Sequence, residues 1–145
     1  MREIHRSALV PYTTTEMFEL VNDVEAYPEF LPWCKAASVS ELGEQDREAS
    51  LEFSRAGLHR RFTTRNHLDP AHRIRMELVN GPFRVLEGSW RFQPLGEAGS
   101  KVILDLRFEF ASRLLEAVFA PVFAEVMNSL VDAFVTRARE LHNAA

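Results

Sequence analysis

The segment Ser112–Leu141, SRLLEAVFAPVFAEVMNSLVDAFVTRAREL, decides the fold of this chain. Its apolar residues recur at the spacing of one side of an α-helix. That side holds Leu115, Phe119, Val122, Phe123, Val126, Met127, Leu130, Phe134, Ala138 and Leu141. The other side carries Glu125, Asn128, Asp132, Thr136 and Arg139. The pattern predicts one amphipathic helix, roughly 45 Å long.

Two properties of this helix bear on the rest of the fold. Proline removes a backbone hydrogen bond and presses on the preceding turn, so we expect a kink or break at Pro121. An apolar face this long and aromatic needs a large surface to cover it. We therefore expect a curved β-sheet wrapped around the helix, with a ligand-sized apolar space between them.

The upstream chain supplies strands for such a sheet. Seven segments alternate apolar and polar residues and are separated by turns rich in Gly, Pro, Asn and Asp. They are Arg2–Val10, Ala36–Leu42, Arg47–Arg55, Leu58–Leu68, His72–Val79, Phe83–Phe92 and Lys101–Phe110. Because most of their links are short, we expect an antiparallel meander.

The segment between the first two strands predicts two short helices. Thr13 and Glu16 have the spacing of a capping box, and a helix is expected from there to about Val21. The next segment, Asn22–Cys34 (NDVEAYPEFLPWC), contains two prolines that limit it to single helical turns. The expected fold class is therefore α+β.

Length and composition are those of one globular domain spanning residues 1–145. Apolar residues make up 46% and charged residues 26%, and the net charge of −4 gives no global case for nucleic-acid binding. The single cysteine, Cys34, excludes an internal disulfide. We see no signal peptide and no run of about 18 uninterrupted apolar residues. We therefore expect a cytoplasmic protein without a transmembrane segment.

Three segments are similar to one known family. The order of elements resembles the helix-grip fold of the START-like (polyketide cyclase-like, SRPBCC) superfamily. Within it, Asn22–Cys34, Phe62–Asn66 (FTTRN) and Asn80–Phe92 (NGPFRVLEGSWRF) resemble the family that joins bacterial RatA-type proteins and mitochondrial coenzyme Q-binding proteins. The resemblance runs from Arg2 to about Glu140.

The resemblance implies a cavity for ubiquinone or another isoprenoid lipid and a role in respiration, with peripheral contact to the inner membrane. For the RatA branch it implies instead a toxin that associates with the large ribosomal subunit and blocks subunit joining. Some relatives in the superfamily are cyclases or dehydratases, which leaves a small enzyme as a weaker alternative.

The expected ligand site lies between the two apolar layers. An isoprenoid chain would be held by buried area, at roughly 25 cal/mol per Å², so few polar groups are needed. Gly88 is expected to leave room on the sheet. The residues expected to line the site are Phe30, Trp33, Phe53, Phe62, Met76, Phe83, Leu86, Trp90, Leu106, Phe119, Phe123, Val126, Met127, Leu130 and Phe134.

Two aromatic side chains leave alternatives open. Trp33, between Pro32 and Cys34, belongs either to a packed loop or to a gate beside the mouth of the cavity. Phe83, after Gly81 and Pro82, would then form the opposite lip.

A second candidate surface is basic. Residues 54–75 contain six arginines and one aspartate, a local balance of +5. They form either a solvated outer face or a patch for the phosphates of rRNA or anionic lipids. Arg60 and Arg61 are consecutive, so one of the two would face inward unless the strand bulges there. The candidate contacts are Arg55, Arg60, Arg61, Arg65, Arg73 and Arg75.

Catalysis has little support in the sequence. Cys34 has no nearby base or positive partner, so we interpret it as a packing residue. His59, His67 and His72 lack the spacing of a helical metal pair. We therefore expect no catalytic residues, no metal and no required cofactor, with a hydrophobic small molecule and the large ribosomal subunit as candidate partners.

Overall fold

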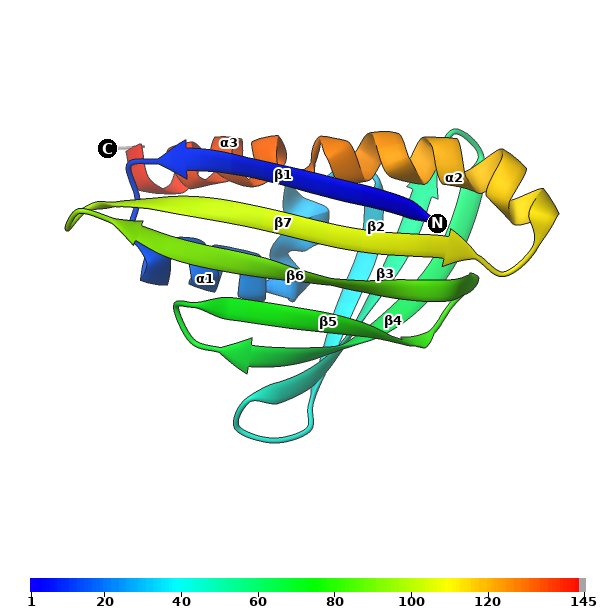
Figure 1. Cartoon of the computed structure of the whole chain (residues 1–145), viewed down its shortest axis with the longest axis horizontal. Coiled ribbons are helices and arrows are strands. Elements are labelled where there is room, and N and C mark those ends of the chain that lie inside the picture. The colour runs from blue at the N-terminus through cyan, green and yellow to red at the C-terminus, as the bar shows by residue number, and fades with distance from the viewer. Residues whose placement is uncertain (144–145) are drawn as a thin grey trace.

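A seven-stranded antiparallel sheet curves around two C-terminal helices (Figure 1). The computed structural model describes residues 1–143. Its elements are β1 (Arg2–Val10), α1 (Thr14–Asn22), the 3₁₀ helix η1 (Val24–Glu29), β2 (Cys34–Glu41), β3 (Asp46–Arg55), β4 (Leu58–Asp69), β5 (Arg73–Asn80), β6 (Phe83–Leu95), β7 (Gly99–Phe110), α2 (Arg113–Asn128) and α3 (Leu130–Asn143). The predicted α+β helix-grip fold is confirmed.

The strand order is β1-β7-β6-β5-β4-β3-β2. Strands β2 to β7 form a simple meander, whereas β1 returns to the far edge and pairs with β7. The chain crosses from one edge of the sheet to the other between β1 and β2, and α1 and η1 make that crossing. These two helices therefore lie against the same concave side as α2 and α3 (Figure 1).

The alternation of the strands sets the two faces of the sheet. In β7 the side chains of Val102, Leu104, Leu106, Phe108 and Phe110 are all buried, as their spacing predicts. Two strands run further than expected, because Pro94 and Leu95 still pair with Ser100 and Gly99 before the turn.

The C-terminal helix is interrupted, but the predicted break at Pro121 is wrong. Helix α2 runs through Pro121, and the helix breaks at Ser129. Pro121 and Ala117 both lie on the exposed side, where water can bond the carbonyl that proline leaves free. At Ser129 the backbone N–H and the hydroxyl both donate to the carbonyl of Val126, which ends the regular ladder.

Most of the apolar face of these helices is buried as predicted, with Val122 half-buried and the two ends less covered. Leu115 is half-buried, and Leu141 is 52% exposed beyond the edge of the core. By length and composition, the segment Arg113–His142 would be able to cross a membrane. Here it packs along the sheet, with Phe119, Phe123 and Phe134 each 1% exposed.

Phe123 of α2 is the centre of the aromatic core. Its ring centroid lies between 4.9 and 6.4 Å from six other rings, which come from β3, β4, β6, β7 and α2 itself. These are Phe53, Phe62, Phe83, Phe108, Phe110 and Phe119. One side chain therefore joins the helix to most of the sheet.

The entry to α1 has the predicted capping box. The Thr13 hydroxyl accepts from the Glu16 backbone N–H at 3.1 Å, and the Glu16 carboxylate accepts from the Thr13 N–H at 2.9 Å. These bonds from Thr13 lower the pKa of Glu16. Tyr12 and Met17, at the positions of a hydrophobic staple, are both buried.

Replacement of Phe123 tests this arrangement. Phe123→Ala should lower the free energy of unfolding by about 3–5 kcal/mol, because it removes buried ring contacts and leaves a cavity. Denaturant titration followed by circular dichroism measures the change. Leu114→Ala on the exposed side of the same helix should change it by no more than about 0.5 kcal/mol. A loss below about 1 kcal/mol for Phe123→Ala would show that the core does not depend on this ring.

Candidate functional site

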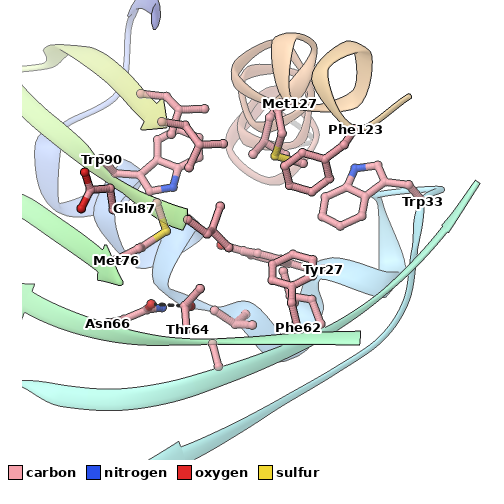
Figure 2. Close-up of a pocket in the computed structure, with 17 residues that line it drawn as sticks. Tyr27, Trp33, Phe62, Thr64, Asn66, Met76, Glu87, Trp90, Phe123 and Met127 are labelled. Atoms are coloured by element: carbon pink, nitrogen blue, oxygen red, sulfur yellow. Dashed lines mark hydrogen bonds between the residues drawn. The ribbon is translucent and has the colours of Figure 1, made fainter. Parts of the chain in front are cut away.

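A partly open apolar cavity of about 80 Å³ lies between the concave face of the sheet, η1 and the C-terminal helices (Figure 2). It is lined by Val24, Tyr27, Trp33, Ala49, Leu51, Phe62, Thr64, Asn66, Met76, Leu86, Glu87, Trp90, Leu104, Leu106, Phe123, Met127 and Leu130. Both tryptophans of the chain are among them.

Nine of the fifteen predicted ligand-site residues line this cavity. They are Trp33, Phe62, Met76, Leu86, Trp90, Leu106, Phe123, Met127 and Leu130. The other six are Phe30, Phe53, Phe83, Phe119, Val126 and Phe134, which pack elsewhere in or beside the core. Phe53 and Phe119, for example, lie 5.2 Å apart in the aromatic cluster, and Phe30 lies under the guanidinium of Arg137.

Sequence reasoning missed eight lining residues, which are Val24, Tyr27, Ala49, Leu51, Thr64, Asn66, Glu87 and Leu104. The alternation of β4 does indicate Thr64 and Asn66, because they share the inward face of this strand with Phe62. Both are polar, however, and a polar side chain on a strand usually indicates the outward face.

The polar part of the lining is a side-chain pair on β4. The Thr64 hydroxyl donates to Asn66 Oδ1 at 2.8 Å (Figure 2). Both side chains are buried, at 8% and 5% exposure. They give an otherwise apolar cavity one hydrogen-bonding corner.

The titratable groups near the cavity are held in unreactive forms. The buried Tyr27 hydroxyl donates to the carbonyl of Val21, and burial raises its pKa. Burial also raises the pKa of the Cys34 thiol to about 11. Glu87, at the exposed rim, accepts from Arg107 at 2.9 Å.

The two aromatic residues considered for the mouth of the cavity are both interior. Trp33 is 5% exposed and lies 5.5 Å from the Phe53 ring, and Phe83 is 6% exposed and stacks on Phe110 at 4.6 Å. For Trp33 the packed-loop alternative therefore describes the structure, with the ring still lining the cavity.

The expectation that Gly88 leaves room for a ligand is wrong. Gly88 does not line the cavity, and a Cβ at this position would lie 2.3 Å from the Asp105 carbonyl oxygen and 3.0 Å from Leu106 Cδ1. The glycine allows β6 and β7 to approach closely, so a larger residue there would disrupt the sheet.

The six arginines of residues 54–75 form two groups, three with a carboxylate partner and three without. Arg55, Arg65 and Arg75 lie 3.4–3.8 Å from Glu125, Glu48 and Glu77 respectively. Carboxylates on α2, β3 and β5 thus offset half of the six arginine charges seen in the sequence.

The other three arginines, Arg60, Arg61 and Arg73, are exposed, and none has a carboxylate within ion-pair distance among residues 1–143. Strands β3 and β4 pair here without a bulge, and Arg60 lies opposite Phe53. Arg60 is therefore the one of the two that lies on the inward side of β4, with Phe62. Its side chain is nevertheless exposed.

The histidines of the same hairpin do not form a metal site in the described part of the chain. His67 bridges Asp46 at 2.5 Å and Glu77 at 2.8 Å, and its hydrogen bond lowers the pKa of Glu77. His72 contacts the Pro70 carbonyl. These contacts are structural links between strands and turns.

Comparison with known proteins agrees with this geometry. The family described as "Polyketide cyclase / dehydrase and lipid transport" matches residues 10–135. The "Ribosome association toxin RatA" of Pseudomonas aeruginosa is 49% identical over 139 residues, covering 96% of each chain. The mitochondrial "Coenzyme Q-binding protein COQ10 homolog B" of Xenopus laevis is 29% identical over 97% of this chain and 59% of that protein.

A solved structure supports the same assignment. An 18 kDa protein of Caulobacter crescentus is 32% identical, covers 99% of both chains and superposes with a TM-score of 0.77. The chain belongs to the family of RatA-type and coenzyme Q-binding proteins, within the START-like superfamily of polyketide cyclases and lipid-transport proteins.

Proposed function

We propose that the protein binds ubiquinone or a related isoprenoid lipid in the cavity between the sheet and α2, and that it supports respiration from the cytoplasm. The observation that carries the proposal is the partly open apolar cavity with one polar corner, Thr64 and Asn66. A coenzyme Q-binding relative that aligns over nearly the whole chain supports the choice of ligand.

The size of the cavity requires it to widen when a ligand enters. Ligand pockets commonly measure about 300–1,000 Å³, whereas this one measures about 80 Å³. Met76 and Met127 line it, and their unbranched thioether side chains change rotamer at little cost. The break at Ser129 divides the helical wall of the cavity into two segments, and the widening would require a small shift between them. Binding would then expand a small preformed space.

Filling the cavity should abolish binding. Ala49 is 4% exposed and lines the cavity, so Ala49→Leu should weaken binding of a short-chain ubiquinone at least about tenfold by occupying its space. Quenching of Trp33 and Trp90 fluorescence measures the affinity. Ala36→Leu, on an exposed position of β2, is the matched control and should bind like the parent protein.

Native mass spectrometry of protein from its own cells identifies the ligand directly. A co-purified isoprenoid quinone at near-stoichiometric amount is expected. Unchanged ubiquinone affinity in Ala49→Leu would contradict binding in this cavity.

The second candidate function is association with the large ribosomal subunit that blocks subunit joining. The RatA relatives, named as ribosome association toxins, favour it, as do Arg60 and Arg61 at the start of β4, which are exposed and have no carboxylate partner among residues 1–143. Guanidinium groups of this kind are suited to bind RNA phosphates. Because neither arginine lines the cavity, a ribosome contact there would leave the cavity free for its own ligand.

Charge reversal tests the ribosome proposal. Arg60→Glu with Arg61→Glu should weaken co-sedimentation with large ribosomal subunits at least about tenfold, and binding of the parent protein should fall steeply with salt. Arg113→Glu with Arg139→Glu makes the same change in net charge at other exposed positions. Equal binding by both double variants would exclude Arg60 and Arg61 from the contact.

Neither proposed function assigns the protein a catalytic role, and the reactivity of the Cys34 thiol tests this. With a pKa of about 11, its thiol should react with iodoacetamide at pH 8 on the order of a hundredfold more slowly than a free thiol. The rate should rise only as the pH approaches 11 or the protein unfolds. Rapid alkylation of the folded protein would contradict this prediction and would indicate that Cys34 is a reactive nucleophile.

A further inference from the structure

The polar corner of the cavity offers one hydrogen-bond donor that the described chain leaves free. Asn66 is 5% exposed, lines the cavity and accepts from Thr64 through Oδ1. Its amide Nδ2 donates to no atom of residues 1–143 and is not sealed within the core. An acceptor inside the cavity can therefore bond to this amide.

The neighbour of Asn66 on β3 is a fixed side chain outside the cavity. Arg47 stands directly opposite Asn66 in the strand register but does not line the cavity. Its guanidinium is held in place, because Nη1 donates to the carbonyl and to Oδ1 of Asn22, at 2.8 and 3.0 Å, and Nη2 donates to Glu41. Asn66 is therefore the amide donor that the cavity itself presents.

The backbone is irregular at this same corner. Thr64 pairs with Leu78 whereas Thr63 pairs with Asn80, so Val79 is the extra residue of a β-bulge in β5. Bulges often lie beside functional sites, where they redirect side chains. Beyond this corner the lining returns to apolar side chains, including Phe62, Phe123 and Met127.

We infer that this corner binds the polar head of the ligand, with Asn66 as the donor that recognises it. The chemical class is an amphiphile with hydrogen-bond-accepting oxygens on a compact head, such as the carbonyl and methoxy groups of a quinone, and an apolar chain. Asn66 Nδ2 donates to a head oxygen, Thr64 orients the amide, and the chain lies along Phe62 and Phe123. This inference rests on the proposed ligand-binding function and adds the orientation of the ligand.

Two probes separate head recognition from apolar burial. Titration calorimetry compares a short-chain ubiquinone with an isoprenoid hydrocarbon of the same chain length that lacks the ring. Asn66→Leu should bind the quinone about tenfold more weakly, since it loses the donor, and should bind the hydrocarbon as well as the parent or better. Thr64→Val should lower quinone affinity by a smaller factor, because the amide loses its orientation.

Asn80→Leu is the matched control. It makes the same exchange at an exposed position of β5 that does not line the cavity. Its affinity for both probes should stay within about twofold of the parent. Hydrocarbon binding by Asn66→Leu shows that the variant retains a folded cavity. If Asn66→Leu does not fold, the quinone affinity of Thr64→Val tests the same corner.

Each outcome decides between the two levels of the proposal. Loss of quinone affinity alone in Asn66→Leu supports the inference. Equal quinone affinity in Asn66→Leu and parent overturns it and leaves the binding function in place, with the amide bonded to water. A parent protein that binds the hydrocarbon but not the quinone also overturns it, and one that binds neither probe overturns the binding function as well.

Discussion

The ring of Phe123 contacts six other aromatic rings, and the remaining structure depends on that contact. It fixes α2 against the sheet at one end of the concave face, where the phenylalanines fill all the space. Toward the other side of the same ring, the lining changes to methionine, leucine and the Thr64–Asn66 pair, and a cavity remains. The aromatic cluster that stabilises the fold and the cavity that we propose binds a ligand therefore lie next to each other along α2. Phe123 belongs to both.

The outer face of the sheet has the opposite chemistry. Its charges alternate across strands, so that Asp105 lies between His5 and Arg91, and Arg107 contacts Glu87 and Glu3. The hydrogen bond from His5, followed by that from Arg91, lowers the pKa of Asp105. Exposed pairs of this kind contribute little stability each. Each of these carboxylates offsets an arginine or histidine on that face, whereas Arg61 at the start of β4 has no carboxylate partner among residues 1–143.

Sequence periodicity predicted the architecture well, because side-chain alternation and helical spacing report directly on burial. It predicted the capping box of Thr13 and Glu16 for the same reason, since that motif is local. It misplaced the helix break, because the tolerance for Pro121 depends on which side of the helix meets water. It also misread Gly88, since the approach of the Asp105 carbonyl comes from a strand paired across the sheet. The polar corner was missed because Thr64 and Asn66 are polar residues on an inward face, and only the assembled fold shows that helices cover them there.

The position of β1 has a consequence for how the chain folds. Its partner is β7, and the pair joins residues about a hundred positions apart, as between His5 and Asp105. Pairings this distant form slowly, because a long loop must close before the contact stabilises it. During synthesis β1 emerges first but has no partner until β7 follows, and the meander from β2 to β6 emerges before the aromatic helix. The nascent chain therefore holds an exposed concave apolar surface until α2 and α3 have left the ribosome.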